Sequence, residues 1–169
     1  KGLSHVTAQT LVKEKDIHYH KLISYWIQHL AGCAAETTVQ TLVASPDGLV
    51  IFPTLAKNGA YAYLKSLVHA WYQGMQSPLP VARRTAFAWL AAPSERANDI
   101  AKAQYEGDDW TSGEVAYDAY LGRFFPSFAS LTDANIGNGF AYWVDELYRP
   151  LFENVMLNQP KLSPATSIE

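Results

Sequence analysis

Apolar residues recur at helical spacing in three long segments of the chain. In residues 22–30, 61–75 and 139–157 they return every three or four positions, which is typical of helices with one apolar face. The sequence therefore predicts three helices there. We assign the aromatic stripe of the second helix to the core rather than to a platform on which nucleic-acid bases stack.

The ends of these helices carry their own signals. Asp16 is a candidate N-cap of the first helix, and Gly74 with Pro78 ends the second. Pro150 lies within the third helix and should kink or divide it. The last segment, 158–169, contains two prolines and small polar residues, so we expect it to be a disordered tail.

Proline and glycine divide the middle of the chain into shorter elements. We expect helices at 84–91, 94–105 and 115–124, with a polar, glycine-containing loop at 106–114 between the last two. Residues 77–80 form a stiff linker before them, because two prolines cannot continue a regular hydrogen-bond ladder.

Short segments near the N-terminus have the composition of strands. Residues 3–6 and 11–15 predict two strands, and 37–52 predicts a hairpin around the turn Ser45-Pro46-Asp47-Gly48. Together the elements predict an α+β fold, with short antiparallel strands near the N-terminus and a mainly helical C-terminal part. We expect residues 1–157 to form a single domain.

Composition narrows the class of protein. Of the 169 residues 49% are apolar, 13% are aromatic and only 17% are charged, whereas an ordinary soluble domain has roughly 25% charged residues. No apolar run approaches the roughly 20 residues of a membrane span. A net charge of −3 argues against a domain that wraps nucleic acid by bulk charge.

The chain has a single cysteine, Cys33, so it cannot form an internal disulfide, and we expect Cys33 to be buried. Because the chain starts at Lys1 without a methionine or a signal-peptide pattern, we expect a fragment of a longer protein.

Histidines and acids provide two groups of candidate chemistry. His18 and His20 could chelate a metal ion, but the predicted helix start points them to different sides and no third ligand is evident, so ordinary surface histidines are expected. The second group consists of four acids in one loop, which could hold Mg²⁺ but are more often simply solvated: Glu106, Asp108, Asp109 and Glu114.

Several stretches, in the same order along the chain, resemble one known family. They are residues 22–30 (LISYWIQHL), 71–79 (WYQGMQSPL), 86–90 (AFAWL), 105–107 (YEG) and 147–152 (LYRPLF). Together they resemble the C-terminal region of RecC proteins, the gamma chains of exodeoxyribonuclease V, which is the bacterial RecBCD helicase–nuclease. The resemblance covers nearly the whole chain and agrees with the expectation of a fragment.

The resemblance implies a PD-(D/E)xK, restriction-endonuclease-like fold that has lost its catalytic residues. Active relatives place an Asp on one strand and (Asp/Glu)-x-Lys on the next, to hold Mg²⁺ and to orient the attacking water. Here Ser4 or His5 stands at the first acid position, Lys13 stands at the second, and only Lys15 is kept. If the motif were aligned one residue further along the strand, Glu14 would stand at the second acid position. Its side chain would then lie on the opposite face of the strand from Lys13 and Lys15. Because an ammonium repels Mg²⁺, we expect no hydrolysis, no metal site and no cofactor in this domain.

The resemblance also implies partners. The whole subunit is expected to help split duplex DNA, channel the strands and read the hotspot Chi, while RecB-like and RecD-like subunits supply the ATP- and Mg²⁺-dependent chemistry in the bacterial cytoplasm. This domain is then a non-catalytic piece that packs against those subunits and upstream RecC domains. The candidate DNA contacts are Lys57, Lys65, Arg83 and Arg84. The candidate partner contacts form an exposed aromatic patch of Trp110, Tyr117, Tyr120 and Trp143.

Two other functions stay open at this point. One is a working Mg²⁺-dependent nuclease that uses the acids of residues 106–118, above all Asp108 and Asp109. The other is a protein-interaction module unrelated to DNA repair.

Overall fold

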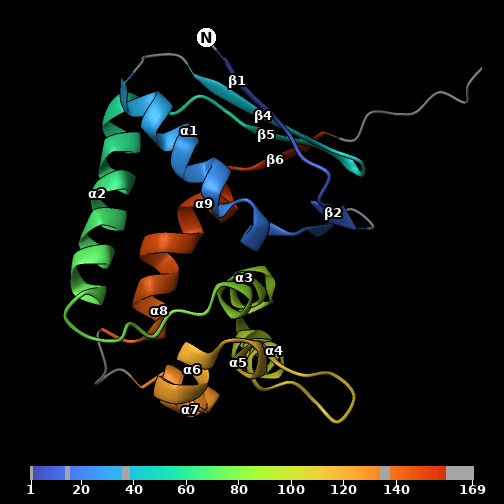
Figure 1. Cartoon of the computed structure of the whole chain (residues 1–169), viewed down its shortest axis with the longest axis vertical. Coiled ribbons are helices and arrows are strands. Elements are labelled where there is room, and N and C mark those ends of the chain that lie inside the picture. The colour runs from blue at the N-terminus through green and yellow to red at the C-terminus, as the bar shows by residue number, and fades with distance from the viewer. Residues whose placement is uncertain (1, 14–15, 36–38, 134–137, 159–169) are drawn as a thin grey trace, which may run out of the picture.

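A small sheet and two long helices form one end of the molecule, and shorter helices form the other end (Figure 1). The structure is a computed structural model that describes residues 2–13, 16–35, 39–133 and 138–158. Its α+β architecture confirms the predicted fold class at that level. No helix in these described ranges is long and apolar enough to cross a membrane.

The main sheet contains strands from both ends of the chain. Its order is β1-β4-β5-β6, and the strands are β1 (Gly2–Val6), β4 (Gln40–Ser45), β5 (Gly48–Phe52) and β6 (Met156–Asn158). β4 and β5 form the predicted hairpin, in which Ser45 pairs with Gly48 across the turn. The Ser45 hydroxyl donates to the Gly48 carbonyl oxygen at 2.9 Å and closes this turn.

The first two predicted strands do not pair with each other. β1 runs parallel to β4 after a crossover that contains a helix, so the prediction of only antiparallel strands in this region is wrong. β2 (Val12–Lys13) instead pairs antiparallel with β3 (Asp16–Ile17) in a separate two-stranded sheet. Parallel neighbours need such a crossover, and pattern alone does not reveal which distant strand will be the partner.

The first long helix begins later than its predicted cap. One 3-10 turn, η1 (Tyr19–Lys21), comes before α1 (Ile23–Ala35), while Asp16 lies in β3, so its assignment as N-cap is wrong. One face of α1 contributes Trp26, Leu30 and Cys33 to the main core, which also contains buried residues of the sheet. Cys33 is completely buried, as predicted.

The second long helix, α2 (Lys57–Gly74), packs along α1. Its two buried residues are small: Ala60 packs in the main core with residues of α1, and Ala70 packs in a separate small core. Leu64 and Leu67 are partly buried against the same core. The helix ends at Gly74 as predicted but begins before the predicted range, at Lys57, and its largest side chains are not the ones that it buries.

The other end of the molecule is a group of shorter helices around a second core. Its predicted helix at 115–124 is divided at Asp118, whose carboxylate accepts from the N–H groups of Tyr120 and Leu121 and so caps the second half. The elements are α3 (Arg83–Ala91), η2 (Ser94–Arg96), α4 (Ala97–Glu106), α5 (Glu114–Tyr117), α6 (Ala119–Phe124) and α7 (Phe128–Leu131).

The last helical segment returns the chain to the sheet. It consists of α8 (Phe140–Trp143), a π-helical turn η3 (Val144–Tyr148) and α9 (Arg149–Glu153). Pro150 has no N–H to continue the helical ladder, and the predicted division occurs at the wide turn directly before it. The predicted extent to residue 157 is wrong, because β6 pairs with β5 from Met156 onward. Residues 159–169 of the predicted tail lie outside the described part of the chain.

Candidate functional site

The outer side of α2 carries a row of large apolar side chains that remain exposed among the described residues. Their relative exposures lie between 58% and 70%, so the prediction that this stripe belongs to the core is wrong. We call these residues the α2 face: Tyr61, Val68, Trp71, Tyr72 and Met75. A helix that is apolar on its inner and its outer side is typical of a segment that is buried in a larger assembly.

An apolar groove adjoins the α2 face. It has a volume of about 430 Å³ and lies between α2, the linker after it and the C-terminal helices. Trp71 and Met75 of the α2 face line it on one side, and Tyr120 and Leu147 line it on another. The Tyr120 hydroxyl accepts from the backbone N–H of Leu79 at 3.0 Å, which fixes this wall. The face and the groove together form one continuous apolar surface, because they share Trp71 and Met75.

Most of the aromatic residues predicted to contact partners are exposed. Trp110 is 92% exposed and Tyr117 is 74% exposed, while Tyr120 is 42% exposed and lines the groove. Trp143 is the exception, since only 1% of it is exposed, and its assignment to the patch is wrong. It packs instead beside Ala70 and Leu79, in a small core under the groove.

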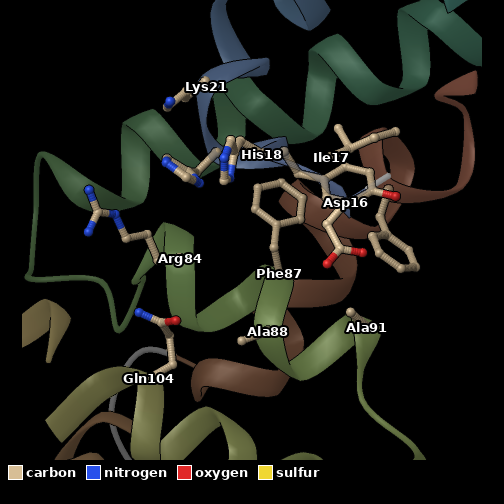
Figure 2. Close-up of a pocket in the computed structure, with 12 residues that line it drawn as sticks. Asp16, Ile17, His18, Lys21, Arg84, Phe87, Ala88, Ala91 and Gln104 are labelled. Carbon is tan, nitrogen blue, oxygen red and sulfur yellow. The ribbon is translucent and has the colours of Figure 1, made fainter. Parts of the chain in front are cut away.

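A second concave feature, the cationic cleft, lies between η1 and α3 (Figure 2). Its volume is about 820 Å³, and residues 16–21 form one wall. The opposite side is formed by Arg84, Phe87, Ala88 and Ala91 of α3, Gln104 of α4 and Phe152 of α9. Figure 2 shows Lys21, Arg84 and Gln104 toward one side of the view and Asp16 toward the other, with Phe87 between them. The cleft therefore has a basic end and an acidic end.

His18 and His20 both line this cleft, and their ring centroids are 5.8 Å apart. The prediction that they point to different sides is therefore wrong, because it assumed a regular helix start where the chain forms strand β3 and a 3-10 turn. Burial, together with the charge of Arg84, lowers the pKa of His20 to about 4. Burial and the charges of Lys21 and Lys13 also lower the pKa of His18. Both imidazoles are consequently neutral at pH 7, and the net positive charge of the basic end comes from Arg84 and Lys21.

The four predicted DNA contacts do not form one surface. Arg83 and Arg84 are both exposed at the start of α3, but only Arg84 is among the residues that line the cleft. Lys57 and Lys65 are exposed on α2, which has no acidic residue along its length. The prediction missed Lys21, whose ammonium donates to the Thr10 carbonyl oxygen at 2.7 Å. Its position directly after two histidines was a signal that could have been used.

The start of α3, and with it Arg84, is held by a buried carboxylate from a different helix. Glu114 is 7% exposed and accepts from the backbone N–H groups of Arg84 at 3.0 Å and Thr85 at 2.8 Å. The Thr85 hydroxyl also donates to it at 2.9 Å. A carboxylate at a helix N-terminus satisfies free N–H groups and interacts favourably with the helix dipole. The end of the 106–114 loop therefore fixes one wall of the cleft.

Two of the other acids of this loop are also used in local structure, while Asp109 is exposed. The Asp108 carboxylate accepts from the Thr111 hydroxyl and from the backbone N–H groups of Trp110 and Thr111, and these bonds lower the pKa of its carboxyl. Glu106 accepts from the Phe128 N–H at 2.8 Å. Within the described ranges, no three His, Cys, Asp or Glu side chains come together in a way that could hold a metal ion.

The expected remnant of a nuclease site is not assembled. Ser4 and His5 lie on β1 of the main sheet, whereas Lys13 lies on β2 of the separate two-stranded sheet. The His5 ring packs against Tyr25 at 5.1 Å between centroids. Lys15, the remaining position, lies outside the described residues, as does Glu14. The residues predicted for the former acid positions are thus not on neighbouring strands.

Comparison with known proteins places the chain in a family. Residues 1–94, more than half of the chain, match the RecC C-terminal domain. The chain belongs to the RecC C-terminal domain family. It is also 29% identical over 135 residues to the RecBCD enzyme subunit RecC of Escherichia coli (strain K12), and this match covers 78% of the chain. The chain spans only 11% of the length of that relative. Membership of the family confirms the resemblance found in the sequence.

Proposed function

We propose that this chain is a non-catalytic domain of a RecBCD-type complex and that it docks other parts of that complex through the α2 face and its groove. The observation that carries the proposal is the exposure of the α2 face, which consists of four residues of α2 and Met75 at its C-terminal cap. The related protein is named as a subunit of the RecBCD enzyme. A domain of such an assembly needs a surface that is apolar and uncovered when the domain is considered alone.

The chemistry of the docking surface indicates the kind of partner. Trp, Tyr and Met are enriched at the centres of protein interfaces because they bury much area in few residues. The α2 groove supplies a depression into which a partner side chain can insert, with Trp71 at its edge. Lys57 and Lys65 lie on the same helix without an acidic neighbour within it, so an acidic rim on the partner is favoured. RecB-like and RecD-like subunits and upstream RecC domains are the proposed partners.

Absence of catalysis in this domain is part of the same proposal. The positions compared with the nuclease acids hold a hydroxyl, an imidazole and an ammonium, which are Ser4, His5 and Lys13. Descent from a PD-(D/E)xK fold, a cytoplasmic location, and a supply of Mg²⁺ and ATP chemistry by the partner subunits belong to the proposal as well. Strand channelling and recognition of Chi are proposed for the whole complex. The alternative nuclease requires Mg²⁺-dependent DNA cleavage by the purified chain that is lost on D108N and D109N, and we expect no cleavage.

Docking can be tested with two substitutions on one helix. Val68→Asp places a carboxylate within the α2 face, and Ala62→Asp places the same group at another exposed position of α2. Binding of the purified chain to RecB-type and RecD-type subunits from the same organism is measured by biolayer interferometry. Val68→Asp should weaken binding at least about tenfold, since a charge in the centre of an apolar interface has to be desolvated.

The docking proposal is judged by comparing Val68→Asp with the control variant and with the wild-type chain. Ala62→Asp should change affinity by less than about twofold, because rim positions contribute little. Both variants should keep the circular-dichroism spectrum and the unfolding midpoint of the unchanged chain, as both positions are exposed. The proposal fails if the unchanged chain binds neither subunit, or if the two variants weaken binding equally.

A further inference from the structure

The cationic cleft combines a basic end, an aromatic wall and an acidic end in one cavity. From this arrangement we propose that the cleft binds a nucleotide, with the phosphate at Arg84 and Lys21, the base against Tyr19, and an amino group of the base at Asp16. This site is separate from the α2 face, and no residue lines both the cleft and the α2 groove.

The basic end is suited to a phosphate. Arg84 presents a planar guanidinium that forms no ion pair with a carboxylate among the described residues. Guanidinium groups bind phosphate through two parallel hydrogen bonds. Lys21 adds a second cation from the opposite wall, and the Gln104 amide adds neutral hydrogen-bonding capacity. Glu114 accepts from the backbone N–H of Arg84, so the point from which this exposed side chain extends is fixed before a ligand arrives.

The wall next to it is suited to a flat ring. Tyr19 is partly exposed, and its ring stacks on Phe87 with a centroid distance of 5.3 Å and packs on Phe152 at 4.8 Å. These contacts keep the Tyr19 ring in place, so a base can pack on it with little further loss of side-chain freedom. The cleft volume of about 820 Å³ lies within the range of roughly 300–1,000 Å³ found for small-molecule sites.

The acidic end adds selectivity. Asp16 lies away from Arg84 across the cleft (Figure 2), and its carboxylate is suited to accept from an exocyclic amino group. Carboxylates are the usual acceptors for the N4 amino group of cytosine. A base that has an amino group, such as cytosine, should therefore be preferred over thymine, which presents a carbonyl oxygen at the equivalent position.

The two histidines provide a reporter inside the cleft. His18 faces Lys13, Asp16 and Lys21 on its own segment and Arg84 on α3, while His20 faces His18 and Lys21 on its own segment and Arg83 and Arg84 on α3. Burial, and after it the nearby cations, disfavours protonation of both rings. A bound phosphate would offset these positive charges and would raise the pKa of both imidazoles. His69, which is exposed on α2, is the internal control for the same measurement.

The experiment compares three probes on the unchanged chain, in which imidazole resonances are followed by NMR during pH titration. The probes are inorganic phosphate, dCMP and a ten-nucleotide oligo(dC). Both nucleotide probes should shift the His18 and His20 resonances and raise their pKa, and neither should shift His69. If oligo(dC) binds more than about tenfold more tightly than dCMP, the natural ligand of the cleft is a nucleic-acid strand. If the two bind with equal affinity, the natural ligand is a free nucleotide. Either result supports a nucleotide site in the cleft.

Two matched variants complete the test. Arg84→Gln should weaken dCMP binding at least about tenfold, as expected for loss of a charged hydrogen-bonding group. Arg96→Gln makes the same change at an exposed position of η2 that does not line the cleft, and it should change dCMP binding by less than about twofold. The proposal is overturned if dCMP leaves the His18 and His20 resonances unchanged, if it binds no better than inorganic phosphate, or if both variants lose equal affinity. Since the docking experiment uses variants of α2 only, failure of either proposal can be recognised without the other.

Discussion

α1 and α2 are neighbouring helices with the same apolar pattern in the sequence, yet the structure uses the two patterns differently. Trp26 of α1 is 2% exposed and lies in the main core, whereas Trp71 of α2 is 66% exposed. His29 of α1 is completely buried, while His69 of α2 is exposed. Each helix thus offers a tryptophan and a histidine that can be compared with those of the other.

The difference shows that an apolar stripe predicts which side of a helix is covered but not by which molecule. Helical spacing places apolar residues on one side of a helix, but the partner of that side can be the same chain or another molecule. α1 directs its stripe at the main core, where Trp26 contacts Phe52 of β5 and Tyr63 of α2 at centroid distances of 5.7 and 6.2 Å. α2 reaches the main core with Ala60, Tyr63 and its leucines, while Tyr61, Trp71 and Tyr72 stay outside. The larger side chains of α2 are therefore available for docking.

The largest expected effect is on the buried tryptophan. Trp26→Ala should reduce the free energy of unfolding by about 3–5 kcal/mol, because it removes a large ring from a packed core and leaves a cavity. Urea unfolding followed by circular dichroism measures this change. Trp26→Phe, which keeps an aromatic ring, should lose markedly less. A loss below about 1 kcal/mol for Trp26→Ala would show that α1 is not an essential part of the core.

The buried histidine gives a smaller, pH-dependent effect. The His29 Nδ1 lies 2.9 Å from the Thr41 hydroxyl oxygen, and burial lowers the pKa of its ring below the usual value of 6.5. Below about pH 6.5 the unfolded chain therefore takes up a proton before the folded chain does, and stability falls as the pH is lowered, by up to about 1.4 kcal/mol per pH unit for this one group. Above pH 6.5 the contribution of His29 is fully present.

The slope of unfolding free energy against pH between 7 and 5 checks this expectation. His29→Gln should have a shallower slope than the unchanged chain, even though it also lowers stability at every pH. His69→Gln is the control for removal of an imidazole from the exposed side of α2, and it should keep the slope. An unchanged slope in His29→Gln would contradict the assignment of the pH effect to this ring.

Local signals in the sequence were sufficient for the hairpin and for the division at Pro150, since turn chemistry and a missing N–H act over a few residues. The parallel pairing of β1 with β4 depends on a distant partner and had no local signal. The cleft depends on η1 being a 3-10 turn after a short strand, which brings His18 and His20 to the same side. Arg84 was identified from its charge, but its position depends on Glu114, a residue 30 positions further along the chain.

The smallest expected effect on stability, and the sharpest test of the comparison, is at the exposed tryptophan. Trp71→Ala should change the free energy of unfolding by no more than about 0.5 kcal/mol, because an exposed side chain loses little packing when it is truncated. The same variant should weaken binding to the RecB-type and RecD-type subunits, since Trp71 belongs to both the α2 face and the groove. Urea unfolding and interferometry on one protein preparation measure both quantities. If Trp71→Ala instead destabilised the chain by more than about 2 kcal/mol, α2 would use its outer stripe for the fold itself, and the contrast with Trp26 would disappear.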